Sequence, residues 1–279
     1  KFTPKFKAGY WDGIIRLWNE DKKTLYTGLF NSIKEFAELR NYELAFDEEE
    51  FNHEYSKEYI TEWLDNQVLT DAEDDIEIRD YQFDAVLNAI YNKRQLIQSP
   101  TSSGKSLILY LFAKFFSEHG KKVLLMTDSS NLVDQLYTDW MKYSFKNDFD
   151  IDKVQRVYAL ATKTITKPIV ISTWHSQHST KKKNDVSHFN ENFDIVLVDE
   201  CHKGEAASIM NIMEQCTDIQ YKIGLTGSLK KAKLNRLTLE GLFGTVFTAT
   251  TLRELIDRGE IADISIHMIM IDYGADIAK

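Results

Sequence analysis

Short apolar runs alternate with longer amphipathic stretches from residue 78 onward, and this alternation restricts the fold more than any other feature of the sequence. The apolar runs have the length of strands and lie at Gln95–Gln98, Lys122–Thr127, Ile169–Thr173, Ile195–Asp199 and Tyr221–Thr226. Helical spacing of apolar residues is found at Lys105–His119, Leu132–Tyr143 and Ser208–Cys216. Such alternation predicts an α/β fold with a mostly parallel sheet, helices on both faces, and active groups at the carboxyl ends of the strands.

The part of the chain before residue 76 has a different pattern and predicts a small α+β unit. Residues 11–19 and the segment around Leu25 read as short strands, because aromatic and β-branched residues stand beside Asp-Gly and Thr-Gly turn signals. Apolar residues at helical spacing predict a helix over Ser32–Arg40, and Lys57–Leu64 has helical potential. The polar run Asp71–Glu77 reads as a linker.

These patterns divide the chain into three parts. We expect an accessory domain with an acidic linker at residues 1–75, an α/β lobe at residues 76–263, and the start of a connection to a further lobe at residues 264–279.

The net charge of −9 is unevenly distributed along the chain. Residues 43–80 hold two Lys and Arg against fifteen Asp and Glu, whereas residues 1–40 carry an excess of three positive charges. The acidic total therefore does not exclude a basic face elsewhere, and the acidic block should lie away from any nucleic acid.

Composition excludes several classes of protein. Two cysteines are too few for a disulfide framework or a zinc cluster, which favours a reducing compartment such as the cytoplasm of the cell that expresses the gene. No apolar run approaches the roughly 18 residues that a membrane helix needs, so we expect no membrane partner.

The strongest local signal is SPTSSGKS, Ser99 to Ser106, which follows a predicted strand and opens a predicted helix. Backbone N–H groups at such a helix start can cradle phosphate oxygens. Lys105 would reach the β- and γ-phosphates, the Ser106 hydroxyl would hold Mg²⁺, and Gly104 would let the backbone approach closely. The glycine that usually begins this motif is Ser99 here. Taken alone, the loop also fits a polar helix start with a capping serine.

A second signal is IVLVDECH, in which Asp199 and Glu200 end a buried strand. An aspartate at that position can hold Mg²⁺ through water, and the adjacent glutamate can polarise an attacking water. Alone, the pair also fits a strand-to-loop turn. The phosphate loop and this strand, in this order within one α/β pattern, predict a site for ATP and Mg²⁺.

Six motifs in order resemble those of superfamily 2 helicases and translocases. They are IRDYQ (Ile78–Gln82), PTSSGKS, TDSSNLVDQ (Thr127–Gln135), ISTWHS (Ile171–Ser176), DECH and LTGS (Leu225–Ser228). A later stretch that begins at Leu242 resembles the segment leading from the first motor lobe towards the second. The resemblance covers residues 78–263, about two thirds of the chain, and implies a RecA-like P-loop lobe.

The resemblance assigns the nucleotide-binding residues. Gln82 would select adenine, Asp199 would hold the metal together with Ser106, and Glu200 would act as general base. The residues that bind the triphosphate and Mg²⁺ would be Thr101, Ser103, Gly104, Lys105 and Ser106.

Further residues are assigned to nucleic acid or to coupling. His202 and Thr226 would couple the nucleotide state to nucleic acid. The residues expected near the phosphate track are Ser129, Ser130, Thr173, Trp174, Thr226 and Ser228. Hydroxyl and backbone N–H groups suit sequence-independent phosphate contacts. Trp174 alone fits a half-buried packing residue better than a base-stacking one.

The N-terminal segment KFKAGYWDGIIRLWN, followed by TGLF and a helix, resembles the accessory domain of bacteriophage UvsW-type helicases. These enzymes are associated with forks, Holliday junctions and R-loops. The resemblance implies an ATP-dependent DNA helicase or translocase that acts on branched or duplex DNA, independently of sequence, and on RNA–DNA hybrids. Lys5, Lys7 and Arg16 beside Trp11 and Trp18 could contact DNA, although the aromatic residues also suit the core of a small domain.

Residues 264–279 are too few for another domain and contain no arginine. The resemblance therefore implies a missing second lobe in cis that carries the arginine fingers, and we expect little or no hydrolysis by this chain alone.

Three other functions fit parts of the pattern. The motor portion of a restriction-modification system shares these ATPase motifs. A nucleic-acid-binding module with a vestigial nucleotide pocket is disfavoured by the intact Lys105, Asp199 and Glu200. A small-molecule P-loop kinase would leave the ordered backbone-contact motifs unexplained.

Overall fold

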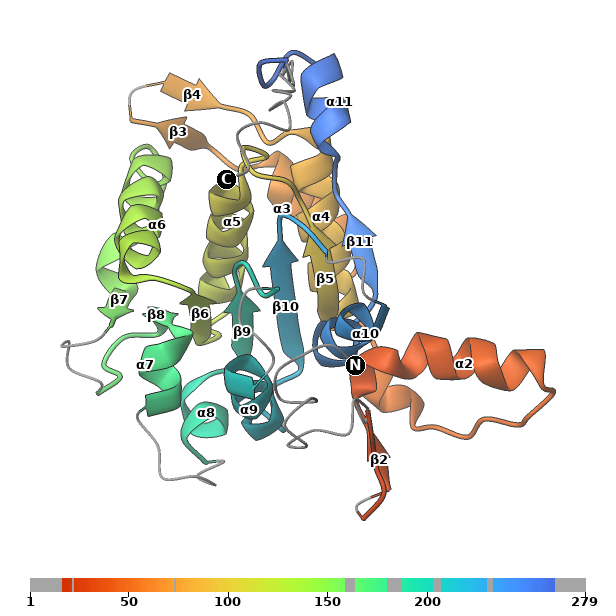
Figure 1. Ribbon diagram of the computed structural model, residues 1–279. Helices are drawn as coiled ribbons and strands as arrows, with labels where there is room; N and C mark the ends of the chain where they lie inside the picture. The colour runs from red at the N-terminus through yellow and green to blue at the C-terminus, as the bar shows by residue number, and fades with distance from the viewer. Residues whose placement is uncertain are drawn as a thin grey trace, which may run out of the picture.

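The computed structural model describes residues 17–21, 23–72, 74–158, 164–179, 187–202, 207–229 and 233–263. A seven-stranded sheet, in the order β11-β5-β10-β9-β6-β8-β7, forms the body of the molecule (Figure 1). Every strand pair within it is parallel. The strands are β5 (Arg94–Gln98), β6 (Val123–Thr127), β7 (Val154–Val157), β8 (Ile169–Thr173), β9 (Ile195–Val198), β10 (Tyr221–Thr226) and β11 (Val246–Thr248). The predicted parallel α/β fold is confirmed, with two edge strands, β7 and β11, that the sequence did not reveal.

Helices cover both faces of the sheet. One face carries α3 (Lys57–Asp65), α4 (Asp80–Asn92), α5 (Lys105–Glu118) and α6 (Ser130–Tyr143), and the other carries α7 (Trp174–Ser179), α8 (Ser187–Asn192), α9 (Ala207–Gln215) and α10 (Lys233–Phe243). Successive strand residues alternate between the two cores, since Val123 packs with the first helix set and Leu124 with the second. Among the described residues, no helix has both the length and the apolar character of a membrane span.

Because all strands of the sheet are parallel, their carboxyl ends meet at one edge. Five neighbouring strands end there, at Gln98, Thr127, Thr173, Val198 and Thr226. These five strand ends lead into the predicted phosphate loop, the DECH segment and the expected nucleic-acid motifs. The topology therefore brings together segments that lie far apart along the chain.

The N-terminal unit is built from small elements. They are β1 (Trp18–Asn19), β2 (Thr24–Leu25), the 3₁₀ turns η1 (Thr27–Leu29) and η2 (Glu48–Phe51), and α2 (Phe30–Leu39). Helix α2 projects away from the sheet beside α10 (Figure 1). At its start, Phe30 stacks on Phe51 at 4.0 Å and meets Phe46 edge-on at 4.9 Å between ring centroids. Trp18 is 52% exposed, and the other expected DNA contacts, at residues 5–16, lie outside the described residues.

The run expected to be a linker, Asp71–Glu77, instead contains part of an antiparallel hairpin. Its strands are β3 (Leu69–Asp71) and β4 (Asp74–Ile76). The acidic residues that suggested a solvated linker find basic partners at the C-terminal end of α6, where Lys142 lies 3.3 Å from Asp71 and Lys146 lies 2.7 Å from Asp75. Because a helix rises 1.5 Å per residue, this end of α6 lies roughly 20 Å from Ser130, one of the residues expected near nucleic acid.

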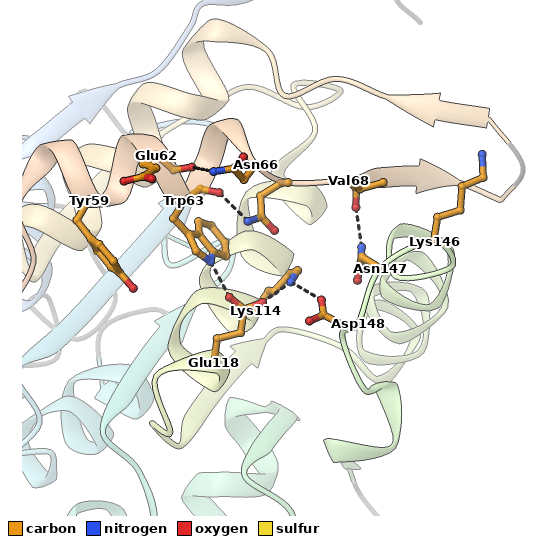
Figure 2. Close-up of a pocket in the computed structure, with 11 residues that line it drawn as sticks. Tyr59, Glu62, Trp63, Asn66, Val68, Lys114, Glu118, Lys146, Asn147 and Asp148 are labelled. Atoms are coloured by element: carbon orange, nitrogen blue, oxygen red, sulfur yellow. Dashed lines mark hydrogen bonds and ion pairs between the residues drawn. The ribbon is translucent and has the colours of Figure 1, made fainter.

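Helix α3 is fastened to α5 by contacts around a pocket of about 540 Å³ (Figure 2). The Trp63 ring meets Phe115 edge-on at 5.0 Å, and its indole N–H donates a hydrogen bond to Glu118 at 2.6 Å. The buried Lys114 ammonium forms ion pairs with Glu118 and, at 3.3 Å, with Asp148. A buried ammonium requires such partners. The contacts of Trp63 hold α3 to α5, and so to the lobe rather than to the projecting α2.

Turn η1 docks against α10 with backbone against backbone. A Cβ atom added at Gly28 would lie 2.2 Å from the carbonyl oxygen of Glu240 and 2.6 Å from that of Gly241. The neighbouring Tyr26 packs over Gly241 and donates a hydrogen bond from its hydroxyl to Glu214 at 2.6 Å. The N-terminal unit is thus joined to the lobe at a position where only glycine fits.

We predict that Gly28→Ala lowers the free energy of unfolding by about 2–3 kcal/mol, because the methyl group overlaps backbone atoms that cannot move aside easily. Urea denaturation followed by circular dichroism measures the change. Gly120→Ala is the control: its φ of 70° disfavours alanine, but no atom lies within 4 Å of the added Cβ. That variant should lose only about 1 kcal/mol. An equal loss in both variants would contradict the close docking.

Candidate active site

The loop between β5 and α5 has the backbone shape of a phosphate cradle. Ser102 and Gly104 adopt left-handed conformations, with φ of 67° and 77°. The positive φ favours glycine at position 104, and a Cβ atom there would lie 2.3 Å from Nε2 of Gln82 and displace that amide. Ser102 adopts its conformation with a Cβ atom present, a strain typical of functional loops.

Ser99 stands where the motif usually has glycine, and the loop accommodates its hydroxyl. The Ser99 and Ser103 hydroxyl oxygens lie 2.6 Å apart, and the Ser103 hydroxyl donates to the carbonyl oxygen of Pro100 at 2.6 Å. Ser99 therefore donates to Ser103. Its backbone N–H donates to the carbonyl oxygen of Thr226 at 2.9 Å, which ties this loop to the end of β10.

Lys105 and Glu200 form an ion pair in the centre of the site. Nζ of Lys105 lies 3.2 Å from Oε1 of Glu200 and donates to the carbonyl oxygen of Ser99 at 3.4 Å. The two side chains are only 12% and 15% exposed, so the pair is partly shielded from water. Glu200 itself has a φ of 47°, an unusual conformation for a residue with a Cβ atom.

Asp199 lies directly after β9 and is 7% exposed. Burial, and next the negative charge of Glu200, raise the pKa of its carboxyl to about 6, although Lys105 opposes the shift. Its Oδ1 accepts a hydrogen bond from the backbone N–H of Glu200 at 2.9 Å. A buried carboxylate with a raised pKa is a group whose negative charge a bound cation would stabilise.

His202 connects Glu200 to the end of β10. Its Nδ1 lies 2.6 Å from Oγ1 of Thr226 and 3.3 Å from Oε2 of Glu200. Thr226 donates its own hydroxyl hydrogen to the carbonyl oxygen of Ser228 at 3.0 Å. The hydrogen on Nδ1 is therefore assigned to His202 by the network, with Thr226 as acceptor. Gly227 also faces Glu200, with its N–H 3.4 Å from Oε2.

Gln82 lies against the phosphate loop and is 2% exposed. Its Oε1 accepts from the backbone N–H of Arg79 at 3.0 Å, and its Nε2 donates to the carbonyl oxygen of Ser103 at 2.9 Å. These two bonds leave one N–H and one oxygen lone pair of the amide unused. The edge of a base can pair with one such donor and one such acceptor.

The donor set fits Mg²⁺. The hydroxyl of Ser106 and the carboxylate of Asp199 both supply oxygen, which this ion prefers. The burial that raises the pKa of Asp199 also favours a cation beside it. Ser106 donates to Oδ2 of Asp139, on α6, at 3.0 Å. Sequence reasoning missed Asp139, because nothing around it distinguishes it from other acidic residues on a helix.

The residues expected near nucleic acid follow the same edge but differ in exposure. Ser130 is exposed, and Ser129 caps α6 by accepting from the N–H of Leu132 at 3.4 Å. Thr173 is buried and donates to Ser176 at 2.9 Å. The ring of Trp174 is 3% exposed and packs within the second core, so this ring is a packing residue rather than a base-stacking one. Aromatic packing explains the position, as the residue alone suggested.

Comparison with known proteins assigns the chain to a family. A family model described as "Type III restriction enzyme, res subunit" matches residues 75–231, and one described as "DNA helicase UvsW, N-terminal" matches residues 1–47. The crystal structure of the UvsW helicase from bacteriophage T4 is 30% identical, with a TM-score of 0.76 and coverage of 88% of this chain and 86% of that chain. The chain belongs to the UvsW-like helicases of superfamily 2.

Two curated relatives agree with this assignment. The ATP-dependent DNA helicase UvsW of phage T4 is 31% identical over 276 residues, which are 98% of this chain and 54% of that helicase. An endonuclease subunit of a type I restriction enzyme from Staphylococcus saprophyticus is 22% identical over 227 residues, 76% of this chain and 24% of that subunit. The UvsW-like chain thus spans about half or less of the length of the curated relatives it matches, and its sheet is a RecA-like lobe.

We predict that Asp199→Asn stabilises the chain in EDTA, because the amide imitates the protonated carboxyl. A folded-state pKa of about 6 against an ordinary 3.8 means that folding favours the protonated form. The wild-type penalty is therefore absent below pH 4, grows as the pH rises towards 6, and is complete above it. At pH 8 the gain should approach about 3 kcal/mol at most, at 1.36 kcal/mol per pKa unit. Urea unfolding at pH 4.5 and pH 8 measures it, and a pH-independent difference would contradict the shifted pKa.

Proposed function

We propose that this chain is the accessory unit and first motor lobe of an ATP-dependent DNA helicase or translocase. The Lys105–Glu200 ion pair at the phosphate loop carries the proposal. Both side chains of this pair can act on a bound nucleotide. The phosphate oxygens attract the Lys105 ammonium, and this releases the Glu200 carboxylate to orient water.

The nucleotide site uses residues on both sides of this pair. The backbone of the phosphate loop, with Thr101, Ser103 and Gly104, cradles the triphosphate, and Lys105 neutralises its charge. Ser106 and Asp199 hold Mg²⁺, which supplies charge neutralisation to the phosphates when bound. Glu200 accepts the proton of the attacking water.

Coupling to nucleic acid passes through the hydrogen bonds of His202. Glu200, His202 and Thr226 are linked in series, and Ser228 follows Thr226 at the carboxyl edge of the sheet. When Lys105 leaves Glu200, the balance of charge around His202 changes. Thr226 and Ser228 then transmit the change to the edge where Ser129 and Ser130 contact the phosphate backbone.

Branched DNA is the substrate that we propose, from the resemblance of the N-terminal segment to UvsW-type helicases. The match of residues 1–47 to the UvsW N-terminal family and the 98% coverage of this chain by the T4 helicase support a helicase over the motor of a restriction system. We propose forks, Holliday junctions and R-loops as the DNA structures recognised. A second lobe in cis completes the nucleotide site with arginine.

ATP hydrolysis with and without forked DNA tests the proposal, in this chain and in the chain extended by the downstream gene sequence. We expect little turnover in the 279-residue chain and DNA-stimulated turnover in the extended protein. Lys105→Ala should reduce turnover at least 100-fold, because the phosphate charge loses its partner. Absence of turnover in both forms would support a vestigial pocket instead, and full activity of the short chain would contradict the need for a second lobe.

We further predict that Thr226→Ala uncouples hydrolysis from DNA. The variant removes both the acceptor for His202 and the donor to Ser228. In the extended protein, the stimulation of ATP hydrolysis by forked DNA should therefore fall about tenfold or more, as for the loss of one polar contact in a site. Affinity for Mg·ATP should stay within about 2-fold. Thr226→Ser, which retains the hydroxyl, is the control and should keep most of the stimulation. Equal loss of stimulation and of ATP affinity would place Thr226 in nucleotide binding instead.

A further inference from the structure

The segment that carries Gln82 is held from its other side by residues that follow helix α11 (Leu252–Asp257). Oε2 of Glu260 lies 3.0 Å from Nη1 of Arg79 and accepts a hydrogen bond from the hydroxyl of Tyr81 at 3.1 Å. Arg79 also donates to that hydroxyl at 2.9 Å. Nη1 of Arg258 lies 2.6 Å from Oδ1 of Asp80. Two residues after α11 therefore contact three consecutive residues before Gln82.

The hydrogen bonds around Tyr81 form a consistent set. Arg79 donates to the Tyr81 hydroxyl, and that hydroxyl donates to the carboxylate of Glu260. Tyr81 is 4% exposed, and Glu260 is largely shielded with a side-chain exposure of 17%. A neutral residue at position 260 would leave the guanidinium of Arg79 without its charged partner.

The position of Glu260 is fixed by the way α11 ends. Gly259 has a φ of 71°, and its N–H donates to the carbonyl oxygen of Ile256 at 2.9 Å. The N–H of Glu260 donates to the carbonyl oxygen of Leu255 at 3.0 Å. This is the hydrogen-bond pattern of a Schellman helix end. Leu255 is fully buried, so the helix end is anchored to the lobe and presents Glu260 in one place.

The same segment reaches the phosphate loop through Gln82, which donates to the carbonyl oxygen of Ser103. Residues 79–82 are thus held between the loop on one side and the end of α11 on the other. We propose that Glu260 and Arg258 are positioning residues for the nucleotide-base subsite. They hold residues 79–82 so that the unused donor and acceptor of Gln82 face the base. This inference rests on the proposed function, since it requires that the site bind ATP.

The test compares two ligands that share phosphates but differ in the base. Isothermal titration calorimetry of the 279-residue chain with Mg²⁺ gives the Kd for ATP and for inorganic tripolyphosphate. We expect Glu260→Gln to weaken ATP binding about 3- to 10-fold and Arg258→Gln about 2- to 5-fold, the range for contacting polar residues. Affinity for tripolyphosphate should stay within about 2-fold, because that ligand has no base to misplace.

Arg253→Gln is the matched control on the same helix. Arg253 pairs with Asp257 at 3.0 Å within α11, and its side chain is 78% exposed. Its loss removes the same charge without disturbing the contacts of residues 79–82, so ATP affinity should not change.

Two results would overturn the inference while leaving the proposed function intact. One is unchanged ATP affinity in the Glu260 and Arg258 variants. The other is an equal loss for ATP and tripolyphosphate, which indicates a loosened phosphate loop rather than a misplaced base subsite. Absence of ATP binding in the wild-type chain, or binding that survives Lys105→Ala, would overturn the proposed function and this inference together.

Discussion

The parallel pairing of β10 with both β5 and β9 is the constraint on which the site depends. Thr226 lies opposite Gln98 in this register, and Gly224 lies opposite both Leu96 and Val198. The three strands therefore end side by side, and the phosphate loop, the Asp199–Glu200 pair and Thr226 follow their ends. The hydrogen bond from Ser99 to Thr226 and the ion pair from Lys105 to Glu200 each join two of these strand ends. A shift of one residue in the β10–β5 pairing would break the contact of Ser99 with Thr226, and a shift in the β10–β9 pairing would displace the Asp199–Glu200 pair from Thr226.

Charge in this site is balanced only partly without ligands. Lys105 neutralises Glu200, while Asp199 remains buried beside it, and its raised pKa is the physical consequence. An arrangement with one cation for two carboxylates favours an incoming cation, and the phosphate loop favours an incoming anion. Mg·ATP brings both charges together. Glu200 and Ser102 also keep a strained backbone, and strain of this kind persists where the surroundings hold it in place.

The sequence was sufficient for the interior of the sheet and insufficient for its edges. Strands β6, β8, β9 and β10 are buried along their whole length and appear as continuous apolar runs, which a sequence displays directly. The edge strand β7 is buried only at its first and last residues and accessible at the two between them, and β11 has three residues, none fully buried. Helix α4 was not predicted, although its buried residues Ala85, Val86, Ala89 and Ile90 recur at helical spacing. The acidic hairpin was missed because its lysine partners lie some seventy residues away, at the end of α6 and just after it.

The candidate site shows a related division. The residue types that act on phosphate and metal are visible in the sequence because they fall in contiguous motifs after strands. The partners that orient them, such as Asp139 for Ser106 and Glu260 for Arg79, come from single positions on other elements. Trp174 shows that a motif does not determine which way an aromatic ring faces: its ring packs in the second core, as the residue type alone suggested. Motifs thus identify which groups react, whereas their orientation depends on long-range contacts that only the folded chain reveals.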